Sequence, residues 1–530
     1  MTCDACARRV RDVLEGAGAQ HVDVDWRAGR ALVEPSGVST RDLSAALNGT
    51  RYRVTRVIEP GARSAGHAAG FEYDLAIVGS GGGAFSAAIA ARRADLRVVM
   101  IERGTVGGTC VNVGCIPSKA LLAAAENRHR ANGTRFPGIT TQAGPVDFPA
   151  LIAAKDEIVE TLRQEKYLDI AAAYGIELLE GNARFVDGLA LDVDGRRIEA
   201  AHYLVATGAE PVIPDIPGLH DSGYLTSTEA MELDHLPESL IVIGGGYVAM
   251  EQAQLFAHLG TQVTMLVRST LARGEEPEIA AELKAAFEAE DIRIREGTQA
   301  SAVCRERHSV LVTTDGRQKY RAEHLLVAAG RRPRTAGLDL DAVGVQAGAG
   351  GEVVVDDGLR TSNSRVWGAG DVTGHPQFVY VAAKHGALVV ANAFEQAGRR
   401  VSYRSLPRIT FTNPTIASAG LTEDQAREEG IDCECRVLNL ANVPRAIVSR
   451  NTCGVVKLVA ERDSGRVIGV HMLADGAGDA ILAGVYAIDA DRTVSDLAAS
   501  WNPYLTIGEG LHLAAQAFTR DVSKLSCCAA

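Results

Sequence analysis

Apolar runs separated by a glycine-rich turn and an alanine-rich stretch open the long central part of the chain. Residues 73–78 form the first run, residues 79–84 read Gly-Ser-Gly-Gly-Gly-Ala, and a second run at 97–101 ends before Glu102. This order predicts strand, turn, helix to Arg93 and strand, with the helix N-terminus free to face a pyrophosphate and Glu102 placed to bond a ribose. The residues predicted to contact this dinucleotide are Gly79, Gly81, Gly82, Ala84 in the third glycine position, and Glu102.

The same pattern recurs about 165 residues later and predicts a second dinucleotide unit. Residues 239–243 and 262–267 are apolar runs, and residues 244–249 read Gly-Gly-Gly-Tyr-Val-Ala before a helical stretch to Leu259. Arg268 and Arg273 follow the second run, where a unit for NADH would carry an acidic side chain. Because arginine pairs with a 2′-phosphate, we expect NADPH, although both arginines could simply be solvated. The predicted contacts are Gly244, Gly246, Ala249, Arg268 and Arg273.

Two cysteines follow the first unit in a glycine-rich segment. Residues 107–119 contain Cys110, Cys115 and Pro117, and an alanine-rich stretch begins at Ala120. Proline suits a first helical turn, so we expect both thiols near a helix N-terminus, with depressed pKa values and reactive thiolates. The pair is predicted to be redox-active; a structural disulfide or two buried thiols would be the alternatives.

Residues 1–58 are predicted to form a small separate α+β module. Helices are expected at 7–14 and 40–47 and strands at 21–26, 30–34 and 52–57. The Cys3–Cys6 spacing before the first helix resembles the metal-binding loop of heavy-metal-associated domains, which are ferredoxin-like. That resemblance implies a soft ion held by Cys3 and Cys6. The family has an opening strand before this motif, so here either the module lacks an edge strand or the start of the chain was assigned too late. A decayed or truncated module that no longer binds metal is the alternative. Residues 59–71, rich in small residues, are predicted to be a linker.

Composition limits the remaining possibilities. A chain of 530 residues with 46% hydrophobic and 23% charged residues is expected to fold into three or four globular domains. The net charge of −12 argues against a nucleic-acid surface. No apolar run reaches the length of a membrane span, and the first residues do not resemble a secretion signal, so a cytoplasmic location with reduced thiols is expected.

The two dinucleotide units, the cysteine pair and the segment 365–371, which ends in Gly370 and Asp371, resemble the pyridine nucleotide-disulfide oxidoreductases. The resemblance implies an α/β fold with two Rossmann-like domains and an α+β dimerisation domain. It assigns FAD to residues 72–220 and 345–402, NADPH to 221–344, and a homodimer interface to 403–530. It adds Thr109, Lys119, Gly208, Gly370 and Asp371 to the FAD contacts.

The end of the chain resembles one branch of that family, the mercuric reductases. Relatives that reduce organic disulfides use a histidine as general acid where this chain has Asn502, and adjacent Cys527 and Cys528 stand near the end. The resemblance implies NADPH-dependent reduction of thiol-bound Hg(II) to Hg(0). Cys527 and Cys528 would collect the ion and pass it to Cys110 and Cys115, with Cys115 against the flavin. Tyr167 and Tyr504 would flank the metal, Lys119 would lie near the flavin, and Tyr504 and the tail would come from the partner subunit.

Two other functions are open at this point. An NADPH-dependent reductase of an organic disulfide is disfavoured by Asn502, since His512 in a predicted helix is expected to be structural. A metal-trafficking protein with vestigial flavin domains is disfavoured by the intact nucleotide fingerprints. The cysteines without a predicted role are Cys304, Cys433, Cys435 and Cys453, although the Cys433-Glu434-Cys435 sequence could bind a metal.

Overall fold

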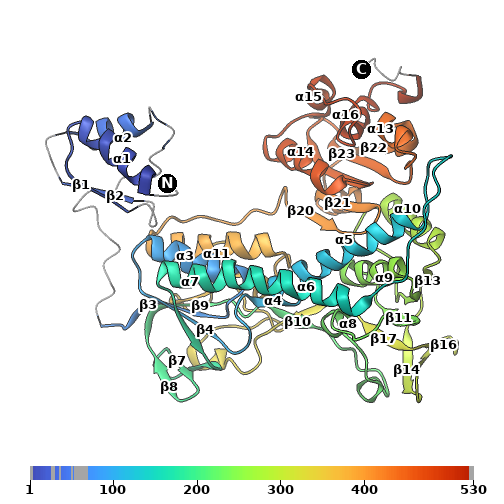
Figure 1. The fold of residues 1–530 in the computed structure, drawn as a ribbon, viewed down its shortest axis with the longest axis horizontal. Coiled ribbons are helices and arrows are strands. Elements are labelled where there is room, and N and C mark those ends of the chain that lie inside the picture. Colours follow the sequence, from blue (N-terminus) through green and yellow to red (C-terminus); the bar gives the residue numbers. More distant parts are fainter. Residues whose placement is uncertain are drawn as a thin grey trace. The chain divides into compact units, whose positions relative to one another are not determined.

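The computed structural model describes residues 4–25, 30–34, 38–48, 50, 52 and 70–524. The chain divides into two compact units, residues 1–66 and 67–530 (Figure 1). No helix among the described residues has the length and apolar character needed to cross a membrane.

The first unit contains two helices and a two-stranded antiparallel sheet. Its elements are α1 (Asp4–Gly16), β1 (Gln20–Asp25), β2 (Arg30–Glu34) and α2 (Thr40–Asn48). Both predicted helices and the hairpin are therefore confirmed, although α1 begins before Cys6, which is buried. The predicted strand at 52–57 and Cys3 lie outside the described residues, apart from Tyr52. The heavy-metal-associated assignment of this unit stays a prediction.

A five-stranded parallel sheet forms the first nucleotide-binding region of the second unit. Its strand order is β19-β9-β3-β4-β5, so a strand from residues 366–368 completes a sheet built from residues 73–205. Its strands are β3 (Tyr73–Val78), β4 (Val98–Glu102), β5 (Glu177–Glu180), β9 (Ala200–Val205) and β19 (Val366–Gly368). The first strand matches the prediction, and the second begins and ends one residue later than predicted.

The helix α3 (Gly82–Arg93) packs on this sheet, and the helix α11 (Val379–Phe394) packs closely against α3. Gly386 permits their contact, because a Cβ atom there would stand 2.1 Å from the carbonyl oxygen of Gly83. Further helices follow β4, and a short antiparallel sheet lies before β9. These elements are α4 (Gly108–Asn112), α5 (Cys115–Ala131), α6 (Phe148–Arg163), the π-helix η1 (Gln164–Leu168), α7 (Asp169–Tyr174), β6 (Ala183–Val186), β7 (Ala190–Val193) and β8 (Arg196–Ile198).

The second nucleotide-binding region has a parallel sheet of order β13-β12-β11-β17 and a three-stranded antiparallel sheet. The strand β11 (Ser239–Ile243), the helix α9 (Tyr247–Leu259) and the strand β12 (Gln262–Leu266) confirm the predicted strand, helix and strand. The other elements are α8 (Ser227–Ala230), α10 (Pro277–Ala289), β13 (Arg293–Arg295), β14 (Ala300–Arg305), β15 (Val310–Thr314), β16 (Lys319–Ala322) and β17 (His324–Val327).

The C-terminal region is an antiparallel sheet of order β20-β21-β24-β23-β22 with helices on one face. Its strands are β20 (Pro407–Thr410), β21 (Thr415–Gly420), β22 (Cys433–Asn439), β23 (Val455–Glu461) and β24 (Val467–Ala474). Its helices are α12 (Glu423–Glu428), α13 (Pro444–Val448), α14 (Ala477–Asp489), α15 (Val494–Ala499) and α16 (Glu509–Gln516). The predicted class, two Rossmann-like regions and an α+β region after a small α+β unit, is confirmed.

Candidate functional site

The redox pair lies on two consecutive helices. Cys110 belongs to the short α4, and Cys115 is the first residue of α5; both carry free thiols and are partly buried. Gly107, in the left-handed region at φ 109°, precedes α4, where a Cβ atom would stand 2.5 Å from Val111. The expected helix begins at Cys115 with Pro117 in its first turn, as predicted, so Cys115 lies at the helix N-terminus.

The pKa values of the two thiols are shifted in opposite directions. A hydrogen bond from Cys110 is the main influence that lowers the pKa of Cys115, to about 7, and the Lys119 ammonium contributes in the same direction. The pKa of Cys110 is raised by the same hydrogen bond, by burial and by the charge of Cys115. The expectation that both thiols ionise at neutral pH is thus wrong for Cys110. Once Cys115 carries a negative charge, the second proton is held between two sulfurs in a partly desolvated site.

Lys119 is held one turn past Cys115 by the second nucleotide-binding region. Its Nζ lies 2.6 Å from Oε2 of Glu251 on α9 and 4.7 Å from the centre of the Phe411 ring. Oε1 of the buried Glu251 accepts a hydrogen bond from the backbone N–H of Phe411 at 2.9 Å. This one carboxylate therefore connects the redox helix to α9 and to the C-terminal region. Glu251 was not predicted, because nothing in the sequence of α9 distinguishes it from a surface glutamate.

Tyr167 lies beside the redox turn. It belongs to the π-helix η1, and its ring meets Phe85 edge-on at 4.9 Å between centroids. Burial, followed by the nearby Cys110 and Cys115, raises the pKa of the Tyr167 phenol. The phenol therefore stays protonated at neutral pH and can donate a hydrogen bond to a thiolate or to a sulfur-bound ligand. A π-helical turn is common at functional sites.

The first glycine-rich turn forms a cradle without side chains, which fits a pyrophosphate. A Cβ atom at Gly79 would stand 2.5 Å from the carbonyl oxygen of Ala206, and one at Gly108 would stand 2.6 Å from Cα of Gly81. Gly81 caps α3 without any side-chain hydrogen bond, so the N-terminal amides are available to an anion. Gly82 and the buried Ala84 lie on α3, and the exposed Thr109 lies on α4.

Glu102 ends β4, as predicted, and its carboxylate is already engaged. Oε2 accepts a hydrogen bond from Ser80 at 2.6 Å, and Oε1 accepts one from the N–H of Gly104 at 2.9 Å. The buried Ser80 in turn accepts a hydrogen bond from the N–H of Gly107 at 3.1 Å. Each carboxylate oxygen retains acceptor capacity for a ribose hydroxyl. The Ser80 contacts, which were not predicted, connect the nucleotide turn to the redox turn.

Gly370 and Asp371 lie where β19 ends, on the short 3-10 helix Gly370–Thr373. Burial raises the pKa of Asp371, and the positive charge of Arg331 opposes that effect. The N–H of Gly370 donates to Nδ1 of the buried His385 at 3.1 Å, which fixes the position of this turn from α11. Gly208 has φ 72° and follows β9, so it also lies at the carboxyl edge of the sheet.

A cavity of about 570 Å³ opens at the carboxyl ends of β11, β12 and β17. The residues that line it include Gly244, Gly246, Arg268, Arg273 and Arg331. The volume falls within the range typical of cofactor pockets. The buried Ala249 lies below the turn on α9. Both arginines are exposed, so a phosphate could reach them, and the choice of coenzyme stays a prediction.

The remaining predicted residues are not brought to the redox pair by the described part of the chain. Tyr504 is 49% exposed in the C-terminal region, and Asn502 lies two residues before it. Cys527 and Cys528 lie outside the described residues. His512 in α16 contacts Leu497 O at 3.1 Å through Nδ1 and Gln516 at 3.0 Å through Nε2, which confirms a structural role.

Two family models match the chain. The model for pyridine nucleotide-disulphide oxidoreductase covers residues 73–386, and the model for the dimerisation domain of the same family covers residues 406–515.

Curated relatives and solved structures agree with this match. The chain is 58% identical to mercuric reductase of Streptomyces lividans over 86% of this chain and 98% of the relative. It is 43% identical to mercuric reductase of Staphylococcus aureus over 100% and 98% of the two chains. The Cu(II) complex of the HOCl-induced flavoprotein disulfide reductase RclA of Escherichia coli superimposes with a TM-score of 0.77 and 29% identity, over 84% of this chain and 99% of that one. The chain therefore belongs to the pyridine nucleotide-disulphide oxidoreductase family, within its mercuric reductases.

Proposed function

We propose that the chain reduces thiol-bound Hg(II) to Hg(0), with NADPH as reductant and FAD as bound cofactor, at Cys110 and Cys115. The single observation that carries this proposal is the free dithiol at the N-terminus of α5, in which Cys115 is acidic and Cys110 retains its proton. Ser80 connects the first nucleotide-binding turn to Gly107 before α4, and Glu251 on α9 connects the second nucleotide-binding region to Lys119 on α5.

Mercury would enter by thiolate exchange, without a change in oxidation state. The Cys115 thiolate attacks Hg(II) in a bis-thiolate complex and one incoming thiolate leaves. Cys110 then forms the second sulfur–metal bond, and its proton departs with the other leaving thiolate as a thiol. Two protein sulfurs suit a soft ion of low coordination number. The protonated Tyr167 beside both sulfurs can stabilise their charge while the exchange proceeds.

The residues present fit both cofactors. FAD would be held by the cradle of Gly79, Gly81 and Gly82, by Glu102 and by the turn at Asp371; NADPH would lie in the cavity lined by Arg268 and Arg273. When bound, the two cofactors supply the hydride and the pair of electrons that the metal accepts. The protein orients the dithiol, holds Lys119 beside Cys115 and keeps a proton on Cys110.

We infer that a homodimer completes the site, with Tyr504 and the Cys527-Cys528 tail contributed by the partner. Several exposed large apolar side chains on the dimerisation domain support this inference. Trp501 is fully exposed, Leu505 is 38% exposed, and Leu482 and Tyr486, one turn apart on α14, are 49% and 63% exposed. Large exposed apolar side chains of this kind are typical of a surface that a partner covers.

Comparing two substrates tests the function. NADPH oxidation by the purified flavoprotein should depend on Hg(II) supplied with excess thiol and should be negligible with glutathione disulfide. Turnover of the disulfide at a rate equal to that of Hg(II) would favour the organic disulfide reductase instead. A protein that binds Hg(II) and never oxidises NADPH would favour metal trafficking.

A further inference from the structure

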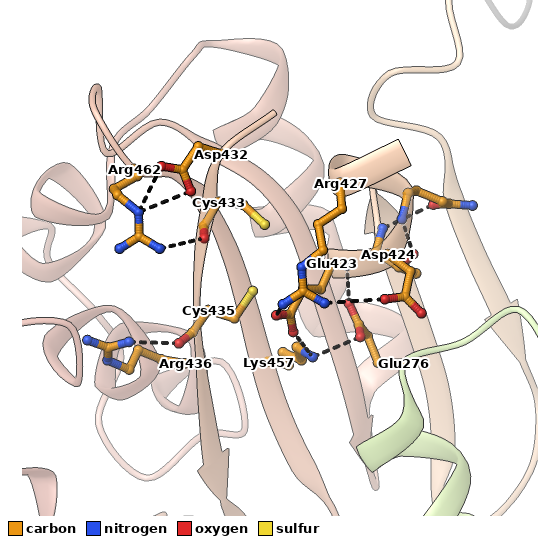
Figure 2. Close-up of polar contacts among 12 residues, drawn as sticks. Glu276, Glu423, Asp424, Arg427, Asp432, Cys433, Cys435, Arg436, Lys457 and Arg462 are labelled. Carbon is orange, nitrogen blue, oxygen red and sulfur yellow. Dashed lines mark hydrogen bonds and ion pairs between the residues drawn. The ribbon is translucent and has the colours of Figure 1, made fainter. Parts of the chain in front are cut away.

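A second pair of cysteines lies on the edge strand of the C-terminal sheet. Cys433 and Cys435 are two residues apart on β22, and side chains at that spacing project from the same face of a strand. Figure 2 shows both sulfur atoms on one side of the strand, the side on which Glu423 and Lys457 lie. Both cysteines are partly exposed, and Val437, next on the same face, is 44% exposed. An ion in solution can therefore reach the pair.

The backbone at both cysteines is fixed on two sides. β23 pairs with β22 through the register Cys433 to Glu461 and Cys435 to Val459. On the other side, the carbonyl of Cys433 accepts a hydrogen bond from Arg462 at 3.1 Å, and that of Cys435 accepts one from Arg436 at 2.8 Å. Edge strands usually leave such carbonyls to water. The two arginines instead hold the strand, so the thiols have a fixed spacing before any ligand binds.

The arginines are themselves anchored. Arg462 bonds both carboxylate oxygens of Asp432 at 3.1 Å. Arg436 donates to the carbonyl of Ala517 at 3.1 Å and lies 5.1 Å from the centre of the Phe518 ring. The side chain of Arg436 therefore packs on the face opposite the thiols, and the thiol face stays open.

The carboxylate of Glu423 lies near the thiol of Cys435. Burial and the negative charge of the nearby Glu423 carboxylate raise the pKa of the Cys435 thiol, and Oε2 of Glu423 lies 2.9 Å from Nζ of Lys457. Lys457 is 2% exposed and also pairs with Glu276 at 2.8 Å (Figure 2). It pairs with Glu278 at 3.1 Å as well. Because the Glu423 carboxylate pairs with the Lys457 ammonium, it is less available as a metal ligand. The site therefore offers two sulfur atoms as its main ligands.

Two sulfurs at this spacing suit a metal better than a disulfide. Residues i and i+2 of a strand are about 6.6 Å apart at Cα, and parallel side chains keep their Cβ atoms nearly as far apart. A disulfide requires Cβ atoms about 3.8 Å apart. Two metal–thiolate bonds of about 2.3 Å each, in line, span about 4.6 Å between sulfurs, which rotation of the two side chains can reach. Zinc would require four ligands, so a soft ion of low coordination number fits best.

We propose that Cys433 and Cys435 form a second dithiol site, which binds one soft, two-coordinate cation such as Hg(II). The ion enters by exchange: each cysteine thiol forms a sulfur–metal bond and gives its proton to a thiolate that leaves the incoming complex, so two free thiols are released. No electrons move. The site holds the ion on the dimerisation domain and does not reduce it, so it goes beyond the proposed function.

The test measures bound metal in the full-length protein. A parent variant carries Ala at the six cysteines already assigned to metal, Cys3, Cys6, Cys110, Cys115, Cys527 and Cys528. It is loaded with Hg(II) in excess glutathione, desalted and analysed for mercury per chain. We expect one equivalent, lost when Cys433→Ser and Cys435→Ser are added and kept with the matched control Cys304→Ser, Cys453→Ser. Either single substitution at the pair should weaken retention roughly 10²- to 10⁴-fold, because the second sulfur acts at high effective concentration.

Alkylation of the wild-type holoenzyme provides a measurement that does not depend on variants that might fail to fold. Prior Hg(II) loading should protect Cys433 and Cys435 together from iodoacetamide, while Cys304 reacts as before. A parent variant without bound mercury, equal loss in the matched control, or protection of only one of the two thiols would overturn the proposal. NADPH oxidation plays no part in either readout, so failure here is distinguishable from failure of the proposed function.

Discussion

The hydrogen bond between Cys110 and Cys115 makes a quantitative prediction. It is the largest influence on Cys115, whose pKa is lowered from 9.0 to about 7. Replacing Cys110 by Ala removes the donor, and the pKa should rise toward 9. At pH 7 the thiolate fraction would fall from about one half to about one hundredth, a factor of ~50. A more basic thiolate is intrinsically more nucleophilic, by about eightfold for two units, so the net alkylation rate should fall about sixfold.

The assay is the pH dependence of iodoacetamide reaction at Cys115, followed by peptide mass spectrometry in reduced protein without NADPH. The matched control, Cys110→Ser, keeps a hydroxyl donor in the same place and should keep a midpoint closer to 7 than Cys110→Ala does. Above pH 9 the order should reverse, with the Ala variant reacting faster than wild type. Identical profiles for the Ala and Ser variants would refute the claim that a hydrogen bond from residue 110 sets the acidity of Cys115.

Three further predictions concern other parts of the chain. Replacing Arg268 and Arg273 together by Gln should raise the KM for NADPH far more than the KM for NADH, because charge-assisted contacts to a 2′-phosphate contribute about 1.5–3 kcal/mol. Equal changes in the two KM values, measured by steady-state kinetics, would show that the arginines do not contact the phosphate. Lys457→Met should lower the free energy of unfolding, measured by urea titration, by about 3–5 kcal/mol, because the carboxylates paired with the buried ammonium would lose their partner. An unchanged urea midpoint would show that this ion cluster adds no stability. Replacing Cys527 and Cys528 by Ala should abolish turnover of Hg(II) bound to glutathione and spare turnover of a small-ligand complex; equal rates on both complexes would remove the tail from the exchange route.

Local sequence was sufficient to predict the two nucleotide-binding units. Strand β3 and strand β11 have the predicted bounds because each is a short apolar run that ends at a glycine turn, a signal contained within a few residues. The position of Cys115 at a helix N-terminus was predicted for the same reason. What local sequence could not supply is the connection between regions. Glu251 reaches Lys119 across 132 residues, and Lys457 reaches Glu276 across 181.

The difference in acidity between the two thiols also could not be read from sequence. A helix N-terminus favours both thiolates. The coupling between the sulfurs keeps one proton on the pair, and the unequal surroundings of the two thiols decide which one holds it. Likewise, Cys433 and Cys435 are incidental in the sequence and become a candidate site only when an edge strand and two arginines hold them on one face.

The central claim is that Cys110 and Cys115 hold the mercury that is reduced. Its most direct test is release of Hg(0) vapour from Hg(II) supplied with excess glutathione, compared between wild type and a Cys115→Ala variant that still binds FAD. We predict steady NADPH-dependent release from the wild type and none above background from the variant. Release at the wild-type rate from Cys115→Ala would contradict the account.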